Sequence, residues 1–102
     1  MCIATVRRLK PGTYELFRAA WEPNPWPRHA THALHLRNDE HPDEVCSLLF
    51  LDLTPEGLEA LRDSPDFTAS EAARIKRVSA HELDVVLNSV YEVVEEVRPP
   101  QR

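Results

Sequence analysis

The sequence predicts an α+β fold of the ferredoxin-like type, βαββαβ, with a four-stranded antiparallel sheet and helices on one of its faces. Two observations predict it. Strand-like and helix-like patterns follow one another in the order β-α-β-β-α-β. The first and third strand-like segments are apolar on both faces, whereas the second and fourth mix apolar and polar residues. This fold orders its strands 4-1-3-2, so the first and third strands are central and the second and fourth are edges, which agrees with the pattern.

The first half of the chain supplies a strand, a helix and a second strand. A strand is predicted over residues 1–8, and residues 1–6 are apolar on both alternating faces, which is typical of a central strand. A turn at Pro11 and Gly12 precedes a predicted helix over residues 13–21, whose aromatic residues recur at the helical period. The prolines of the next segment end that helix. Residues 31–37 mix His, Thr and Leu, as expected for an edge strand.

The second half supplies the other central strand, the remaining helices and the last strand. Residues 45–52 are apolar on both faces and predict the second central strand. Thr54 and Ser64 are each followed by proline, which is typical of a helix start. The helical region from residue 55 to about residue 87 is therefore predicted to break near Ser64. Residues 90–97 alternate Val with Glu and predict the last edge strand.

Length and charge limit the class of protein. The chain predicts a single domain over residues 1–102, and its net charge of −5 argues against nucleic-acid binding, which needs a clustered positive face. No stretch approaches the roughly 20 apolar residues of a membrane span, and the first residues lack a secretory pattern, so we expect a cytoplasmic protein. Cys2 and Cys46 are expected about six residues apart on antiparallel strands, as free and mostly buried thiols.

The apolar pattern also predicts a partner. Helices can cover only one face of a four-stranded sheet, yet both central strands have apolar residues on two faces. A second copy of the chain is the simplest cover for the other face, because symmetric pairs dominate oligomers. We therefore expect a homodimer formed through the sheet face.

The order of elements, the length, the turn at Lys10-Pro11-Gly12 and the helix start at Ser64-Pro65-Asp66-Phe67 carry a resemblance. The chain resembles the dimeric α+β barrel superfamily, in particular its antibiotic-biosynthesis-monooxygenase-like branch. The resemblance implies a dimer, a pocket in each subunit between sheet and helices, and a small hydrophobic or aromatic ligand. Its members include cofactor-independent oxygenases, haem-degrading enzymes, isomerases and ligand-binding domains. The haem-degrading pattern has an Asn on the first strand, which residues 1–6 lack, so its catalytic residues are not transferred.

Three histidines at three-residue steps, His29, His32 and His35, raise the question of a metal site. On a strand, His32 and His35 point to opposite faces, so they do not share a metal, and we expect neither a metal nor another cofactor. His32 is a candidate base or hydrogen-bond donor in a pocket, because the pKa of histidine lies near neutral pH. The alternative is a solvated or hydrogen-bonded residue of an edge strand.

Two aromatic residues complete the candidate set. Trp26 lies in the proline-rich loop and could close a pocket by stacking on a planar ligand, or anchor the core or a dimer interface. Tyr91 could orient a ligand carbonyl through its hydroxyl, or pack its ring and leave the hydroxyl in water.

Two functions from different classes follow. The first is a cofactor-independent, monooxygenase-like enzyme that acts on a small aromatic or hydrophobic ligand, with Trp26, His32 and Tyr91 as the ligand-binding candidates and His32 and Tyr91 as the catalytic ones. The alternative is a non-catalytic dimer that binds a small molecule or has a structural role. A ligand-sized cavity with His32 or Tyr91 pointing inward favours the enzyme, and side chains that fill this space disfavour it.

Overall fold

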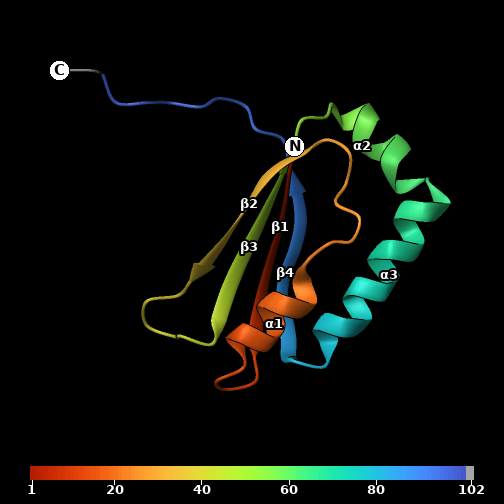
Figure 1. Cartoon of the computed structure of the whole chain (residues 1–102). Coiled ribbons are helices and arrows are strands. Elements are labelled where there is room, and N and C mark those ends of the chain that lie inside the picture. Colours follow the sequence, from red (N-terminus) through yellow and green to blue (C-terminus); the bar gives the residue numbers. More distant parts are fainter. Residues whose placement is uncertain (101–102) are drawn as a thin grey trace.

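The computed structural model describes residues 1–100, which form a four-stranded antiparallel sheet and three helices (Figure 1). The strands are ordered β2-β3-β1-β4, which confirms the predicted 4-1-3-2 topology read from the other edge. The elements are β1 (Cys2–Leu9), α1 (Tyr14–Trp21), β2 (Ala30–Arg37), β3 (Glu44–Leu51), α2 (Pro55–Arg62), α3 (Pro65–Ser79) and β4 (Glu82–Tyr91).

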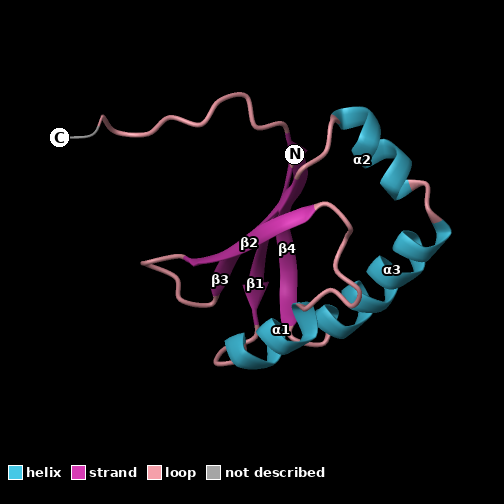
Figure 2. Ribbon diagram, turned by 45° about the horizontal axis from the view of Figure 1, so that its top comes forward, coloured by secondary structure: helices cyan, strands magenta, loops and turns pink. Residues whose placement is uncertain are grey.

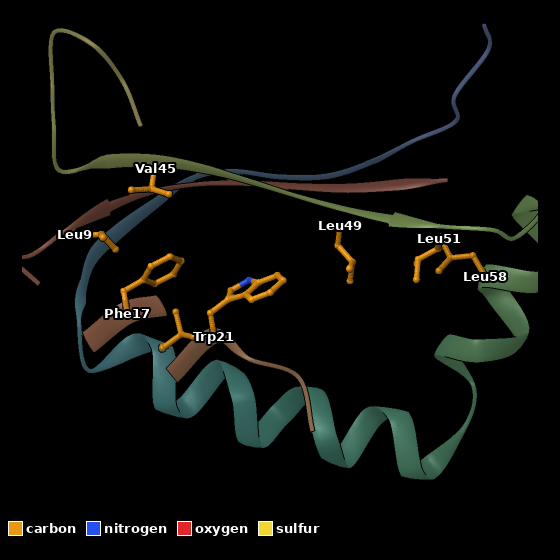
Figure 3. Close-up of a cluster of buried hydrophobic side chains, with 8 residues drawn as sticks. Leu9, Phe17, Trp21, Val45, Leu49, Leu51 and Leu58 are labelled. Carbon is orange, nitrogen blue, oxygen red and sulfur yellow. The ribbon is translucent and has the colours of Figure 1, made fainter. Parts of the chain in front are cut away.

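The helices lie on one side of the sheet and leave the other side uncovered (Figure 2). The core fills the space between these layers, and Figure 3 shows its side chains pointing from β1 and β3 toward the helices. Phe17 of α1 has no exposed surface at all. Full burial of such a side chain contributes about 1.5–3 kcal/mol to folding. The core residues are Leu9, Phe17, Trp21, Val45, Leu49, Leu51, Leu58 and Val78.

Both predicted helix starts are present. Thr54 accepts a hydrogen bond from the backbone N–H of Gly57, and Ser64 accepts one from that of Phe67. Proline occupies the first turn of α2 and of α3, where its missing N–H costs nothing. The predicted break near Ser64 is therefore confirmed, because α2 and α3 are separate helices.

The predicted boundary between the last helix and the last strand is wrong. The helical region ends at Ser79 and not near Leu87, and the strand is Glu82–Tyr91 and not residues 90–97. Two register shifts in the β1–β4 ladder make the apolar spacing of β4 irregular, so that it mimics a helical pattern. The N–H of Lys10 donates to the carbonyl of His81 at 3.0 Å, and its ammonium donates to the carbonyl of Ala80 at 2.9 Å. These contacts between distant segments therefore end α3 at Ser79, although the local sequence pattern predicts a longer helix.

The cysteines are free, as expected. Cys2 pairs with Phe50 and Cys46 pairs with Val6, so four residues separate them along the ladder, about 13 Å at the usual rise. The offset is smaller than expected but still too large for a disulfide. Cys2 is buried and Cys46 is partly buried, and burial raises the pKa of both thiols. Among the described residues, no helix combines the length and the apolar character that a membrane crossing requires.

Candidate functional site

A ligand-sized hollow lies where the proline-rich loop after α1 meets α2 and α3. Its volume of about 480 Å³ falls in the range typical of small-molecule sites, and it is partly open to solvent. We call it the Trp26 pocket. It is lined by Pro25, Trp26, Pro27 and Arg28 from the loop, and by Leu61, Ser64, Asp66, Phe67, Ser70 and Glu71 from the helices.

A chain of contacts orients Trp26. Its indole Nε1 donates to Oε1 of Glu22 at 3.2 Å, and Arg18 donates to Oε2 of the same carboxylate at 2.6 Å. The hydrogen bond from Arg18 is the main reason why the pKa of Glu22 lies below its usual value. Trp21 meets the Trp26 ring edge to face, with the ring centres 5.8 Å apart. The indole is therefore held from two sides while one part of its surface faces the pocket.

The remaining walls of the Trp26 pocket are mixed. Phe67 adds a second aromatic ring, and Leu61 adds an aliphatic surface. Arg28 and Asp66 are exposed polar groups at the rim, whereas Glu71 is neutralised by an ion pair with Arg74. An aromatic and aliphatic lining with a few polar groups suits a small planar apolar molecule.

Beneath this loop, His35 is packed inside the layer between sheet and helices. Its ring makes edge-to-face contacts with Trp21 at 4.5 Å, Phe17 at 5.7 Å and Tyr14 at 6.5 Å between centres. Its Nδ1 shares a hydrogen bond of 2.8 Å with the hydroxyl of Ser47, and its buried Nε2 finds no partner among residues 1–100. Burial, with a smaller effect of nearby arginines, lowers the pKa of His35 to about 4. The imidazole is therefore neutral at pH 7.

Arg7 is a second buried polar group in this layer. Its Nε donates to Glu82 at 3.1 Å, its guanidinium lies over the Phe17 ring at 5.5 Å, and its buried Nη1 has no partner among the described residues. A nearby gap has a volume of about 10 Å³, enough for one water molecule, and is lined by Ile3, Thr5, Trp21, Ser47, Leu49 and Arg74. The centre of the layer is thus filled by side chains, and ligand-sized space lies outside it, beside Trp26.

The structure separates the three predicted site residues. Trp26 lines the pocket named after it. His32 lies on the uncovered face of edge strand β2, where its ring stacks on Phe50 with centres 4.6 Å apart. Tyr91 lies on the same face of β4, the opposite edge strand, in register with Cys2. Within the chain, the three side chains do not converge on one site. His32 and His35 lie on opposite faces of β2, as the strand pattern predicted.

The uncovered face of the sheet is apolar. The residues of β3 that alternate with its core positions point to this side. The residues in register with them across the sheet point the same way. Leu34 and Leu36 of β2 are 44% and 47% exposed, and Tyr91 of β4 is 51% exposed. We call this surface the open face, and its side chains are Cys2, Ala4, Val6, His32, Leu34, Leu36, Cys46, Leu48, Phe50, Leu87, Ser89 and Tyr91.

A second surface hollow of about 380 Å³ lies beside the loop between β2 and β3. Three of its charged groups already have partners: Glu44 lies 3.9 Å from Arg8, and Asp43 accepts a hydrogen bond from the N–H of Gly12. No aromatic ring other than that of His41 lines it among the described residues. Residues 1–100 also contain no cluster of three or more His, Cys, Asp or Glu side chains that could hold a metal ion.

Two contributors to the Trp26 pocket could not be identified from the sequence. Phe67 follows a helix start and has the spacing of a core residue, and Arg28 lies among loop residues without a pattern. Both belong to the pocket because the loop folds back onto α3, a contact between segments far apart in the chain. No local sequence signal reports such a contact.

No protein-family model and no curated protein sequence matches the chain. Solved structures do. A proposed antibiotic biosynthesis monooxygenase from Chloroflexus aurantiacus matches with a TM-score of 0.64 and 14% identity over 94% of this chain and 95% of the other. A second such protein, from Bordetella bronchiseptica, matches with a TM-score of 0.60 and 16% identity over 90% of this chain and 96% of the other. A third, from Deinococcus radiodurans, matches with a TM-score of 0.60 and 13% identity over 99% of this chain and 100% of the other. The chain thus has the antibiotic-biosynthesis-monooxygenase-like fold, as its resemblance implied.

Proposed function

We propose that the protein is a homodimer that binds one small aromatic or hydrophobic molecule per subunit in the Trp26 pocket. The pocket itself carries this proposal: it has the volume of a small-molecule site, an oriented indole and a second aromatic ring in its lining. Arg7 is buried and His35 is partly buried, and both lie in a layer with room for about one water molecule. The geometry therefore favours recognition of an apolar molecule.

The open face supports the dimer. Exposed leucines on a sheet face are costly in water, because burying each apolar side chain contributes about 1.5–3 kcal/mol. A contiguous apolar surface of this kind on a small protein is typical of an interface. A second copy presents the same surface, so that one twofold axis covers both open faces at once.

Binding is tested by titrating the protein with phenols, naphthols and quinols and measuring affinity by calorimetry. We expect Trp26→Ala to weaken binding about 5-fold to 150-fold, because stacking on an aromatic side chain contributes about 1–3 kcal/mol. Trp26→Phe should retain most of the affinity. Ile75→Ala changes an exposed apolar residue outside the pocket lining and serves as the matched control. Equal affinities of the wild type and Trp26→Ala for every ligand that binds would refute the site.

The dimer is tested by sedimentation. We expect the wild type to sediment as a dimer at micromolar concentration, and Leu36→Lys to shift it toward the monomer by placing a charge on the open face. A wild type that remains monomeric up to millimolar concentration would refute the dimer.

A second candidate function is a cofactor-independent monooxygenase. The aromatic lining favours it, and the structural neighbours named above are described as proposed antibiotic biosynthesis monooxygenases. In such a reaction the substrate supplies the electrons: a phenol and dioxygen give a quinone and water. Oxygen uptake with the same panel tests it, with His32→Ala/Tyr91→Phe as the variant that tests those two residues. Uptake that is lost in Trp26→Ala supports the enzyme, and uptake equal to that of buffer for every bound ligand leaves binding as the function.

A further inference from the structure

We propose that the Trp26 pocket binds an aromatic zwitterion, a molecule whose ring carries a short chain with a carboxylate and an ammonium group. Arg28 binds the carboxylate, and Asp66 binds the ammonium. This inference rests on the proposed binding function and deepens it, because it names the chemical class of the aromatic ligand. The apolar walls of the pocket hold the ring, and the charged end of the ligand lies at the rim.

Two of the charged side chains that line the pocket have no partner of opposite charge. Glu71 forms an ion pair with Arg74, and both side chains of that pair are largely buried. Arg28 and Asp66 line the same pocket, but neither forms an ion pair within residues 1–100. Both are exposed. The rim therefore presents one positive and one negative charge that a ligand can neutralise.

The two charges belong to different walls of the pocket. Arg28 comes from the proline-rich loop, directly after the buried Pro27, and Asp66 comes from the first turn of α3. They do not pair with each other, so a ligand group can enter between them. A guanidinium presents several N–H donors in one plane, which suits a carboxylate. An ionised carboxylate only accepts hydrogen bonds, which suits an ammonium.

The sum of these charges favours a ligand with both signs. A ligand that has only a carboxylate is attracted by Arg28 and repelled by Asp66, and a ligand that has only an ammonium meets the reverse, so attraction and repulsion largely cancel. A ligand with both groups is attracted twice, when each group lies next to the opposite charge. Such complementary charges contribute to specificity more than to affinity. The pocket should therefore select zwitterions among molecules that share one ring.

The aromatic part of the pocket adds no net charge. Trp26 donates to the carboxylate of Glu22, but Arg18 compensates the charge of that carboxylate. Phe67 and Leu61 extend the lining with an aromatic ring and an aliphatic surface. An indole or phenyl ring suits such a lining. An aromatic amino acid is the simplest molecule that joins such a ring to both charges.

Four ligands with one ring system separate the contributions of the two charges. Near pH 7, L-tryptophan has both charges, tryptamine has only the ammonium, N-acetyl-L-tryptophan has only the carboxylate, and 3-methylindole has neither. We expect calorimetry to give the highest affinity for L-tryptophan, at least about threefold above that of each other ligand. Trp26→Ala should weaken the binding of L-tryptophan, because its ring occupies the pocket beside this indole.

Neutral variants test the assignment of each charge. Arg28→Gln should lower the ratio of the affinities for L-tryptophan and tryptamine at least about threefold, because these ligands differ in the carboxylate. Asp66→Asn should lower the ratio for L-tryptophan and N-acetyl-L-tryptophan by as much. Arg62→Gln and Asp63→Asn make the same changes at exposed positions outside the pocket lining and should leave both ratios unchanged. Ratios that stay constant in Arg28→Gln and Asp66→Asn would overturn the assignment.

Binding without charge selection would separate this inference from the proposed function. If the wild type binds 3-methylindole, a phenol or a naphthol at least as tightly as L-tryptophan, and Trp26→Ala weakens that binding, the zwitterion is overturned and the binding function remains. If Trp26→Ala binds every ligand as tightly as the wild type does, the pocket is refuted as the site, and the zwitterion with it.

Discussion

The pH dependence of folding follows from the burial of His35. The folded state lowers the pKa of this imidazole to about 4, from 6.5 in the unfolded chain. Between these values the unfolded chain binds a proton that the folded protein does not, so the free energy of unfolding must fall as the pH falls. The contribution is complete above about pH 6.5 and is lost progressively toward about pH 4.

The two pKa values set the magnitude. Between about pH 7.5 and about pH 5, the difference between these pKa values lowers the free energy of unfolding by about 2 kcal/mol. His35 is only partly buried, and screening by solvent reduces the expected loss to about 1–1.5 kcal/mol. The pKa of Glu22 lies below the ordinary carboxyl value, so this residue titrates largely below the chosen window.

Urea unfolding at the two pH values measures this loss. His35→Gln keeps a hydrogen-bonding side chain next to Ser47 but cannot titrate, so the difference between wild type and variant isolates the imidazole. We expect the wild type to lose about 1–1.5 kcal/mol more than His35→Gln between about pH 7.5 and about pH 5. Equal losses in the two proteins would show that His35 is not held neutral by burial.

Three further predictions concern stability and are read from urea midpoints. Phe17→Ala should lower the free energy of unfolding by about 3–5 kcal/mol, because its ring is fully buried. Leu16→Ala, on the exposed side of α1, should change it by about 0.5 kcal/mol or less. Similar losses in the two variants would contradict the assigned core. Ser64→Ala should cost about 1 kcal/mol by removing the cap of α3, with Ser64→Asp restoring it; full stability of the alanine variant would contradict the cap. Gly12→Ala should cost about 1 kcal/mol because φ is +72°, although its Cβ would meet no atom within 4 Å; a neutral result would mean that the turn relaxes.

The sequence predicted the topology because its signals are local or periodic. Central and edge strands differ in how many faces must be apolar, and a hydroxyl residue before proline marks a helix start wherever it occurs. The end of α3 was missed because it depends on Lys10, which lies far away in the sequence and donates to the last carbonyls. A register shift next to Arg7 then hid the period of β4.

The site was predicted only in part. Three prolines around Trp26 indicated a stiff loop with a presented aromatic residue, and Trp26 does line the pocket. The roles assigned to His32 and Tyr91 remain predictions, and both residues lie on the open face, away from that pocket. His35 is the histidine that packs against the helices, and the spacing alone could not distinguish it from His32, because the covered face depends on pairing with Ser47.

The two thiols on the open face act as native reporters of its coverage. Cys46 is partly accessible in the isolated subunit and Cys2 is buried, and neither forms a disulfide. A maleimide should therefore alkylate Cys46 first. If a second subunit shields this surface, the alkylation rate will fall as protein concentration rises, and no engineered label is required to follow association.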